Sequence, residues 1–248
     1  GELITEISTD KNSEIGEIWE QFQNIIFCLK KQIEQNYEME LKIKEIRLKY
    51  YETQMNPHFL FNTLQMIKMM SVLGENENVS SVTVKLAKLL RFNLYEVHEV
   101  TLREEIENVE NYLYILKKRY KDKFNYRLII TEEILDCYVL KFMLQPFIEN
   151  AVTHGFVNND VFEIAVTGTL VNDEIAVVVH DNGSGIEKEK LKNIKESLNG
   201  NTYSGYGIGL CNVNERIKLM YGDKYGIDIF STGSGTSVLV HFPLRKNI

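Results

Sequence analysis

The sequence predicts an α+β protein in which a long helical hairpin precedes a domain of helices packed on a sheet. Three observations support this prediction. Residues 1–100 contain a single proline and are dominated by helix formers, with apolar side chains at three- and four-residue steps. From Phe124 onward, runs that alternate apolar and polar residues indicate strands, with a buried helix between them. Turn residues mark two hairpins, so an antiparallel-rich sheet covered by helices is expected.

The composition is that of a globular protein. The 248 residues are 44% hydrophobic and 25% charged, enough for one large domain or two small ones. A net charge of −7 without a dense basic stripe argues against nucleic-acid binding. Cys28, Cys137 and Cys211 lie far apart, which fits a reducing compartment and gives neither a disulfide framework nor a zinc site.

The ends of the chain also carry information. No run of about eighteen apolar residues is present, so no membrane span is predicted within these residues. Gly1 is not a natural start and no signal-like segment follows it. We therefore expect a fragment of a longer protein; the alternative is a tag remnant on a complete chain.

An apolar seam runs along the first predicted helix. It continues almost to Pro57, too long to stand alone, so we expect it to be buried in a dimer. Pro57 lacks a backbone donor and should bend the helix beside His58, on the helix's outer part. The seam consists of Ile15, Ile18, Phe22, Ile25, Leu29 and Ile33, followed by Met39, Ile43, Ile46 and Tyr50.

A polar break at residues 74–78 separates this helix from a return helix. Two helices joined by a short break form an antiparallel hairpin, and two copies of it would make a dimeric four-helix bundle. The positions that indicate the return helix are Val82, Leu86, Leu89, Asn93 and Val97.

A second domain is predicted to begin near Thr101, where Thr101 and Glu104 have the spacing of a capping box. The helix that follows has an inner stripe of Ile106, Val109, Leu113 and Leu116. Residues 124–131 are predicted as a strand. A buried helix is marked by Leu140, Met143, Leu144, Phe147, Ile148 and Ala151. Hairpins are predicted over residues 162–179, turning at Asn172-Asp173, and over 225–243, turning at Gly233-Ser234-Gly235.

Asn150 and His154 lie one turn apart on the same face of that buried helix. An amide oxygen suits magnesium, which takes a few hard oxygen ligands and keeps waters and phosphates as the rest. Taken alone, the same residues also fit a helix that simply ends in polar residues before Gly155.

Asp181 follows directly on a predicted strand and begins the run Asp-Asn-Gly-Ser-Gly. There a carboxylate can accept a hydrogen bond from an exocyclic amine such as that of adenine. Gly183 and Gly185 allow the backbone to approach a flat base closely. By itself the run also fits an ordinary turn.

Gly205, Gly207 and Gly209, with Leu210, open a helix predicted to run to about Tyr221. Glycines before a helix N-terminus expose backbone N–H groups toward an anion. A dinucleotide-binding fingerprint is excluded, because no strand ends directly before these glycines. The lysine-rich segment 188–204 is expected to be a lid over a bound nucleotide or, alternatively, a solvated linker.

The four patches, in this order, resemble the N, G1, G2 and G3 boxes of the GHKL ATPases, whose ATP-binding domain is an α/β sandwich called the Bergerat fold. The last box is Gly233-Ser234-Gly235-Thr236, before the final strand. The resemblance covers residues 144–242 and implies that the chain binds ATP with magnesium.

The N-terminal half narrows the resemblance to sensor histidine kinases of the YesM/LytS type. The motifs are QMNPHFLFNTL around His58, Tyr112 with Arg119-Tyr120, LQPFIENAVTHG and GIGLCNVNERI. Residues 14–16 with the seam that follows also resemble the second helix of a HAMP module. The implied domains are a partial HAMP helix over 1–38, a dimerisation and phosphotransfer hairpin over 39–100 and a catalytic ATP-binding domain over 101–248.

The resemblance implies roles for individual residues. His58 would be the phosphoacceptor, Asn150 a magnesium ligand and Asp181 the adenine contact. The remaining residues implied to bind the nucleotide are His154, Gly183, Gly185, Gly205, Gly207, Gly209, Leu210, Thr236 and Arg119.

Two departures from the family pattern matter. Many relatives carry lysine before the N-box histidine, whereas this chain has Thr153, so Arg119 or a lid lysine would have to contact the phosphates. Many other histidine kinases have an acidic residue after the phosphoacceptor, and here it is Phe59. Asn62, one turn on, can orient the His58 ring but cannot take its proton.

The implied function is autophosphorylation of a histidine, then transfer to an aspartate of a response regulator receiver domain. The implied protein is a homodimer whose cytoplasmic portion this chain supplies, with a membrane sensor segment upstream. Two alternatives remain open at this point: a GHKL-type ATPase that hydrolyses ATP to drive a clamp, and a degenerate kinase that acts as a signalling scaffold.

Overall fold

The computed structural model describes residues 22, 24–27, 29–32, 57–95, 97–155, 161–198 and 207–245. The chain divides into two compact units, residues 1–60 and 61–248. In the first unit, the described residues between 22 and 32 are helical, and Phe22, Ile25 and Leu29 of the predicted seam are exposed. The rest of the seam lies outside the described residues. So do the residues directly before Pro57, and the bend predicted beside His58 therefore stays a prediction.

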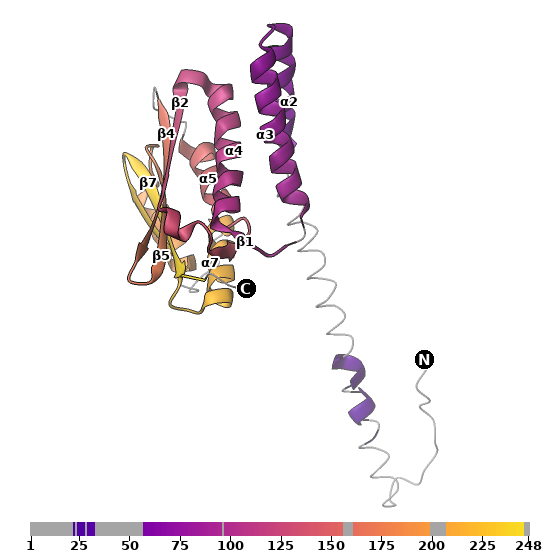
Figure 1. Ribbon diagram of the computed structural model, residues 1–248. Coiled ribbons are helices and arrows are strands. Elements are labelled where there is room, and N and C mark those ends of the chain that lie inside the picture. Colours follow the sequence, from indigo (N-terminus) through magenta and orange to yellow (C-terminus); the bar gives the residue numbers. More distant parts are fainter. Residues whose placement is uncertain are drawn as a thin grey trace, which may run out of the picture. The chain divides into compact units, whose positions relative to one another are not determined.

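Two helices form the predicted hairpin, α2 (Pro57–Val72) and α3 (Asn76–Leu94) (Figure 1). The turn between them contains Gly74, whose φ of 74° lies in the left-handed region that glycine adopts without strain. Val82, Leu86 and Leu89 of the predicted stripe are buried. The prediction that Val97 belongs to this helix was wrong, because α3 ends at Leu94 and Val97 is exposed beyond it.

Helix α4 (Leu102–Tyr120) begins with the predicted capping box. The Thr101 side chain accepts a hydrogen bond from the Glu104 backbone N–H, and the Glu104 carboxylate accepts one from the Thr101 N–H. Two short strands precede and follow this helix in sequence, β1 (Glu99–Thr101) and β3 (Tyr138–Leu140), and they pair antiparallel. The sequence did not predict this small ladder.

The main sheet has five strands in the order β2-β4-β5-β7-β6. Their bounds are β2 (Phe124–Ile130), β4 (Phe162–Val171), β5 (Glu174–Asp181), β6 (Gly226–Thr232) and β7 (Gly235–Pro243). The β4–β5 and β6–β7 hairpins confirm the prediction, and the φ angles of Asn172 (50°) and Asp173 (63°) are those of a tight hairpin turn. Only β2 departs from the antiparallel pattern, because it pairs parallel with β4.

Helices α4, α5 (Gln145–Gly155) and α7 (Ile208–Tyr221) cover one side of this sheet (Figure 1). Helix α6 (Lys188–Leu198) contacts α7 and β6. The buried face of the sheet carries the alternate apolar residues of the strands, including Phe162, Ile164, Val166, Ile175, Val177, Val179, Val240 and Phe242. Among the described residues, no helix is long and apolar enough to cross a bilayer.

The structure bears on two expectations for the helices. Residues 188–198 of the expected lid form helix α6, which buries Ile194 and Leu198 and contacts α7 and β6; residues 199–206 lie outside the described part, so the lid stays a prediction. Leu140, Met143 and Leu144 are buried as predicted, but they precede α5 instead of belonging to it.

Candidate nucleotide site

Helix α5 carries the first group of predicted site residues. Asn150 is half-buried, and within the described residues its amide has no hydrogen-bond partner, so it is available to a ligand. His154, one turn on, is exposed. The hydroxyl of Thr153 donates to the Glu149 carbonyl of the same helix, 2.8 Å away, and is therefore engaged within α5. The helix ends at the buried Gly155.

Asp181 lies at the end of β5 with only 8% of its surface exposed. Its Oδ1 accepts a hydrogen bond from the Gly183 N–H at 2.9 Å. Burial raises the pKa of this carboxyl above its ordinary value, and hydrogen bonds from the backbone N–H groups of Gly183 and Thr236 offset part of that effect. A carboxylate held by backbone donors at a strand end is oriented to accept one further hydrogen bond from a ligand.

Glycines let three backbone segments meet at Asp181. A Cβ on Gly183 would lie 2.7 Å from the Cα of Gly155, and one on Gly235 would lie 2.2 Å from the Asp181 carbonyl oxygen. A Cβ on Gly185 would lie 1.7 Å from the Thr232 carbonyl oxygen. No side chain fits at any of these positions. The N, G1 and G3 boxes are therefore in direct backbone contact.

A serine and a threonine complete this contact. The Ser231 hydroxyl accepts a hydrogen bond from the Ile186 N–H at 2.8 Å and lies 3.0 Å from the Thr236 hydroxyl. Thr236 is the register partner of Asp181 across the β5–β7 ladder. Sequence reasoning missed Ser231, because a hydroxyl inside a strand gives no signal of this kind.

The second glycine box lies at the N-terminus of α7. Gly207 occupies the N-cap position with a φ of 72°, Gly209 is exposed and Leu210 is buried. A Cβ on Gly209 would come within 4.0 Å of Pro146 in the first turn of α5. This box therefore contacts the N-terminal end of α5, whereas Gly183 contacts its C-terminal end. Gly205 lies outside the described residues.

The remaining predicted residues lie on other elements. Arg119, near the end of α4, is half-buried and its guanidinium stacks 5.1 Å from the Tyr120 ring centre. His58 is exposed on α2 and belongs to the first compact unit, whereas the boxes belong to the second. Asn62 is half-buried on the same helix.

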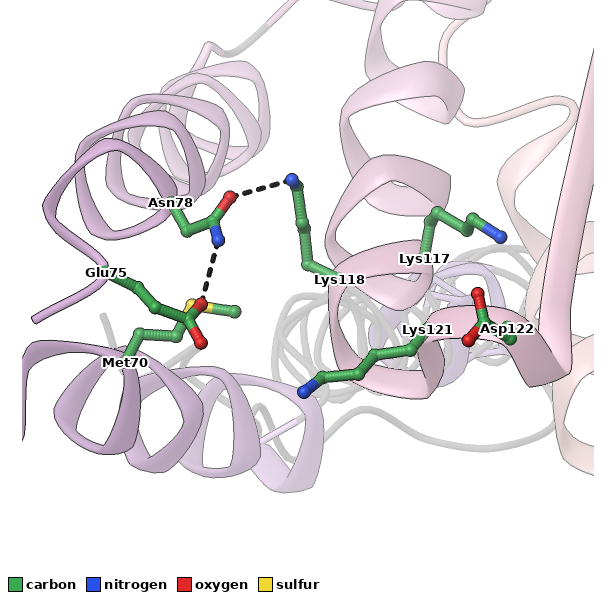
Figure 2. A pocket seen from close by; sticks show the side chains of 7 residues that line it. All are labelled: Met70, Glu75, Asn78, Lys117, Lys118, Lys121 and Asp122. Atoms are coloured by element: carbon green, nitrogen blue, oxygen red, sulfur yellow. Dashed lines mark hydrogen bonds between the residues drawn. The ribbon is translucent and has the colours of Figure 1, made fainter. Parts of the chain in front are cut away.

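A separate hollow of about 340 Å³ lies between the α2–α3 turn and the C-terminal end of α4 (Figure 2). Figure 2 shows Lys118 donating to the Asn78 amide oxygen (2.8 Å), and Asn78 donating to Glu75 (2.8 Å). The other lining residues are Met70, Lys117, Lys121 and Asp122. None of these residues belongs to a nucleotide box, so we do not assign this hollow to ATP.

The residues present fit a magnesium ion only if the nucleotide phosphates and waters supply most of its ligands. No group of three or more histidine, cysteine, aspartate or glutamate side chains lies together in the part of the chain that the structure describes. Magnesium is commonly held by one or two protein oxygens and completed by phosphates and waters. The partly exposed amide of Asn150, which has no hydrogen-bond partner among the described residues, matches that requirement.

This arrangement of helix, glycine loops and mainly antiparallel sheet defines an ATP-binding domain of the GHKL class. Residues 138–246 match the family model described as "Histidine kinase-, DNA gyrase B-, and HSP90-like ATPase", and residues 46–124 match the model described as "Histidine kinase". The resemblance to sensor histidine kinases is thereby confirmed, and both segments of this family are present in one chain.

Two individual relatives are sensor kinases that match over most of this chain. The chain is 30% identical over 241 residues to the sensor histidine kinase YesM of Bacillus subtilis, a match that covers 95% of this chain and 40% of YesM. It is 31% identical over 237 residues to the sensor protein kinase HptS of Staphylococcus aureus, covering 95% of this chain and 45% of HptS. The chain therefore spans less than half the length of these relatives.

Solved structures are more distant. The catalytic domain of histidine kinase ThkA is 19% identical with a TM-score of 0.44, covering 61% of this chain and 98% of that one. The histidine kinase AdeS of Acinetobacter baumannii is 18% identical with a TM-score of 0.43, covering 78% of this chain and 98% of that one.

Proposed function

We propose that this chain is the kinase region of a sensor histidine kinase, which phosphorylates His58 from ATP and passes the phosphoryl group to an aspartate of a response regulator. The main support is that one chain combines an exposed histidine, within a histidine kinase segment, with nucleotide boxes in backbone contact. In the first step the bond from the γ-phosphorus to the bridging oxygen of ADP breaks, and a nitrogen of His58 bonds to phosphorus. In the second, an aspartate oxygen replaces that nitrogen.

The chain's own residues position the reactants. Asp181 accepts a hydrogen bond from the adenine amine, and the glycines beside it allow the base to lie against the backbone. The backbone N–H groups at the start of α7 would attract the phosphates. Asn150 would hold magnesium, and the metal would supply neutralisation of the phosphate charge. Phosphoryl transfer depends mainly on such alignment and charge neutralisation.

Thr153 does not replace the lysine that other family members carry, because its hydroxyl is engaged with the Glu149 carbonyl. We assign the additional phosphate contact to a cation outside α5. Arg119 and the lysines of residues 188–204 are the candidates.

The helical hairpin supports a homodimer. Apolar side chains on α2, α3 and the turn between them are more than half exposed, and pairing two hairpins into a four-helix bundle would bury them. They are Phe61, Leu64, Met69, Val72, Leu73, Val84 and Leu94. We further propose that the remaining length of the full protein includes a membrane sensor segment and that the present residues are cytoplasmic.

The test is to incubate the chain with γ-labelled ATP and magnesium, beside a His58→Ala variant. A His98→Ala variant is the matched control, since His98 is also exposed but lies outside every motif. We expect acid-labile label on the wild type and the control, and none on His58→Ala. Release of free phosphate without labelled protein would favour the clamp ATPase, and neither product would favour a scaffold. Label on both the wild type and His58→Ala would refute the assignment of His58.

A further inference from the structure

Helix α4 presents a buried polar face where an apolar stripe would be ordinary. Glu105 is 0% exposed, and Asn108 and Asn111 are 3% and 2% exposed. A buried carboxylate is costly unless hydrogen bonds compensate its lost hydration. The sequence offered no role for Glu105, and none of the nucleotide boxes contains it.

The Glu105 carboxylate holds the backbone directly before α5. One oxygen accepts a hydrogen bond from the Phe142 N–H at 3.0 Å, and the other accepts one from the Leu144 N–H at 2.9 Å. Phe142 has a φ of 57°, an uncommon conformation for a bulky residue that needs such external support. Both carboxylate oxygens are thus used to fix two residues just before the N-box helix.

A second contact reinforces the first. Asn108, one turn along α4, donates to the Gln145 side-chain oxygen at 3.2 Å, and Gln145 donates to Glu149 at 2.9 Å. The first turn of α5 is therefore tied to α4 through a backbone contact and a side-chain contact. A negative carboxylate at a helix N-terminus is also favoured by the helix dipole.

The position of α5 determines where Asn150 lies, because Asn150 is in the second turn of this short helix. The far end of α5 is fixed separately, by the tight packing of Gly155 against Gly183. With both ends held, the backbone of α5 at Asn150 is fixed relative to Asp181. Without the contact at the start, α5 would keep its packing beside Asp181 but could shift at Asn150.

We propose that Glu105 is a positioning residue for the magnesium–phosphate half of the nucleotide site, acting through the start of α5 on Asn150. This inference rests on the proposed function, because it assumes that Asn150 holds magnesium. Glu105 does not touch the nucleotide. Its loss should weaken the contribution of magnesium to nucleotide binding and leave recognition of the base by Asp181 intact.

The experiment measures the affinity of the chain for a non-hydrolysable ATP analogue by calorimetry, once with magnesium and once with EDTA. We expect Glu105→Gln to reduce the gain in affinity due to magnesium roughly tenfold, as is typical when a group that orients a metal ligand is removed. Affinity in EDTA should stay at the wild-type value. Glu107→Gln is the matched control, an exposed glutamate on the same helix, and should match the wild type under both conditions.

A double variant separates positioning from general structural support. If Glu105 acts through Asn150, Glu105→Gln should add little to the loss caused by Asn150→Ala. Should Glu105→Gln fail to fold, Asn108→Ala tests the adjacent contact. This variant should show a smaller reduction in the affinity gained from magnesium, with the affinity in EDTA unchanged. Equal losses with magnesium and in EDTA, or an unchanged magnesium gain, would overturn the proposal. A wild type that binds no nucleotide would instead refute the proposed function itself.

Discussion

Two buried carboxyl groups, Glu105 and Asp181, show how side chains in this domain are fixed by backbone donors. Each accepts hydrogen bonds from main-chain N–H groups, and burial raises the pKa of each above its ordinary value. Asp181 could be recognised in the sequence because glycines surround it. Glu105 could not, because a glutamate in a helix is normally exposed and only the tertiary structure places it against the start of α5.

Glu105 also predicts how stability depends on pH. Burial raises its pKa from 4.5 to about 7, opposed by the N–H groups of Phe142 and Leu144 and by the nearby charge of Arg216; Lys141 faces it as well. The folded state therefore binds more protons than the unfolded state between pH 4.5 and 7, so this group's contribution to stability is lost as pH rises through that window. The loss is on the order of 3 kcal/mol.

Urea unfolding of the wild type and Glu105→Gln at several pH values tests this prediction. The wild type should lose stability relative to the variant as the pH is raised from 5 toward 8, because glutamine does not titrate. Parallel stability curves for the two proteins would show that Glu105 titrates normally.

At the scale of elements, the features that could be predicted are those that depend on local sequence pattern. The α2–α3 break, the capping box of α4 and both β-hairpins follow from periodicity and turn residues. The parallel pairing of β2 with β4 could not be predicted, because alternation shows that a strand has one buried face but not which strand lies beside it. Helix α6 was missed although Leu191, Ile194 and Leu198 have helical spacing, since its many lysines suggested a solvated segment.

The β6–β7 turn yields a prediction with its control two residues away. Gly235 has a φ of 148°, and a Cβ there would meet the Asp181 carbonyl oxygen at 2.2 Å, whereas a Cβ on Gly233 would meet no atom within 4 Å. Gly235→Ala should destabilise the protein by roughly 1–3 kcal/mol and weaken nucleotide binding by displacing Asp181. Gly233→Ala should stay within about 0.5 kcal/mol of the wild type. Urea unfolding and nucleotide titration of both variants measure the contrast, and equal effects would exclude the contact as its cause.

At the scale of the whole molecule, the candidate site was predictable because its residues are recognisable in groups. The structure brings the N, G1 and G3 boxes together around Asp181, and glycines in short runs mark places where backbones approach closely. The roles of these residues in binding a nucleotide stay predictions. The polar contacts that hold α4 against α3 and α5 were not predictable. Lys118 with Asn78, and Tyr114 with Ser81, are 40 and 33 residues apart in sequence and share no local signal.

The distribution of charge over the described residues predicts a weak response to salt. In six of the seven ion pairs found there, at least one side chain is half exposed or more, so each pair contributes at most about 1 kcal/mol. The chain carries a net charge of −7, and salt also screens the repulsion that this excess creates. The two effects oppose each other, while the apolar core under the sheet is insensitive to screening. Between about 0.1 and 1 M NaCl, the free energy of unfolding in urea should therefore change by less than about 1 kcal/mol. A loss of several kcal/mol in high salt would mean that ion pairs, rather than the core, hold the domain together.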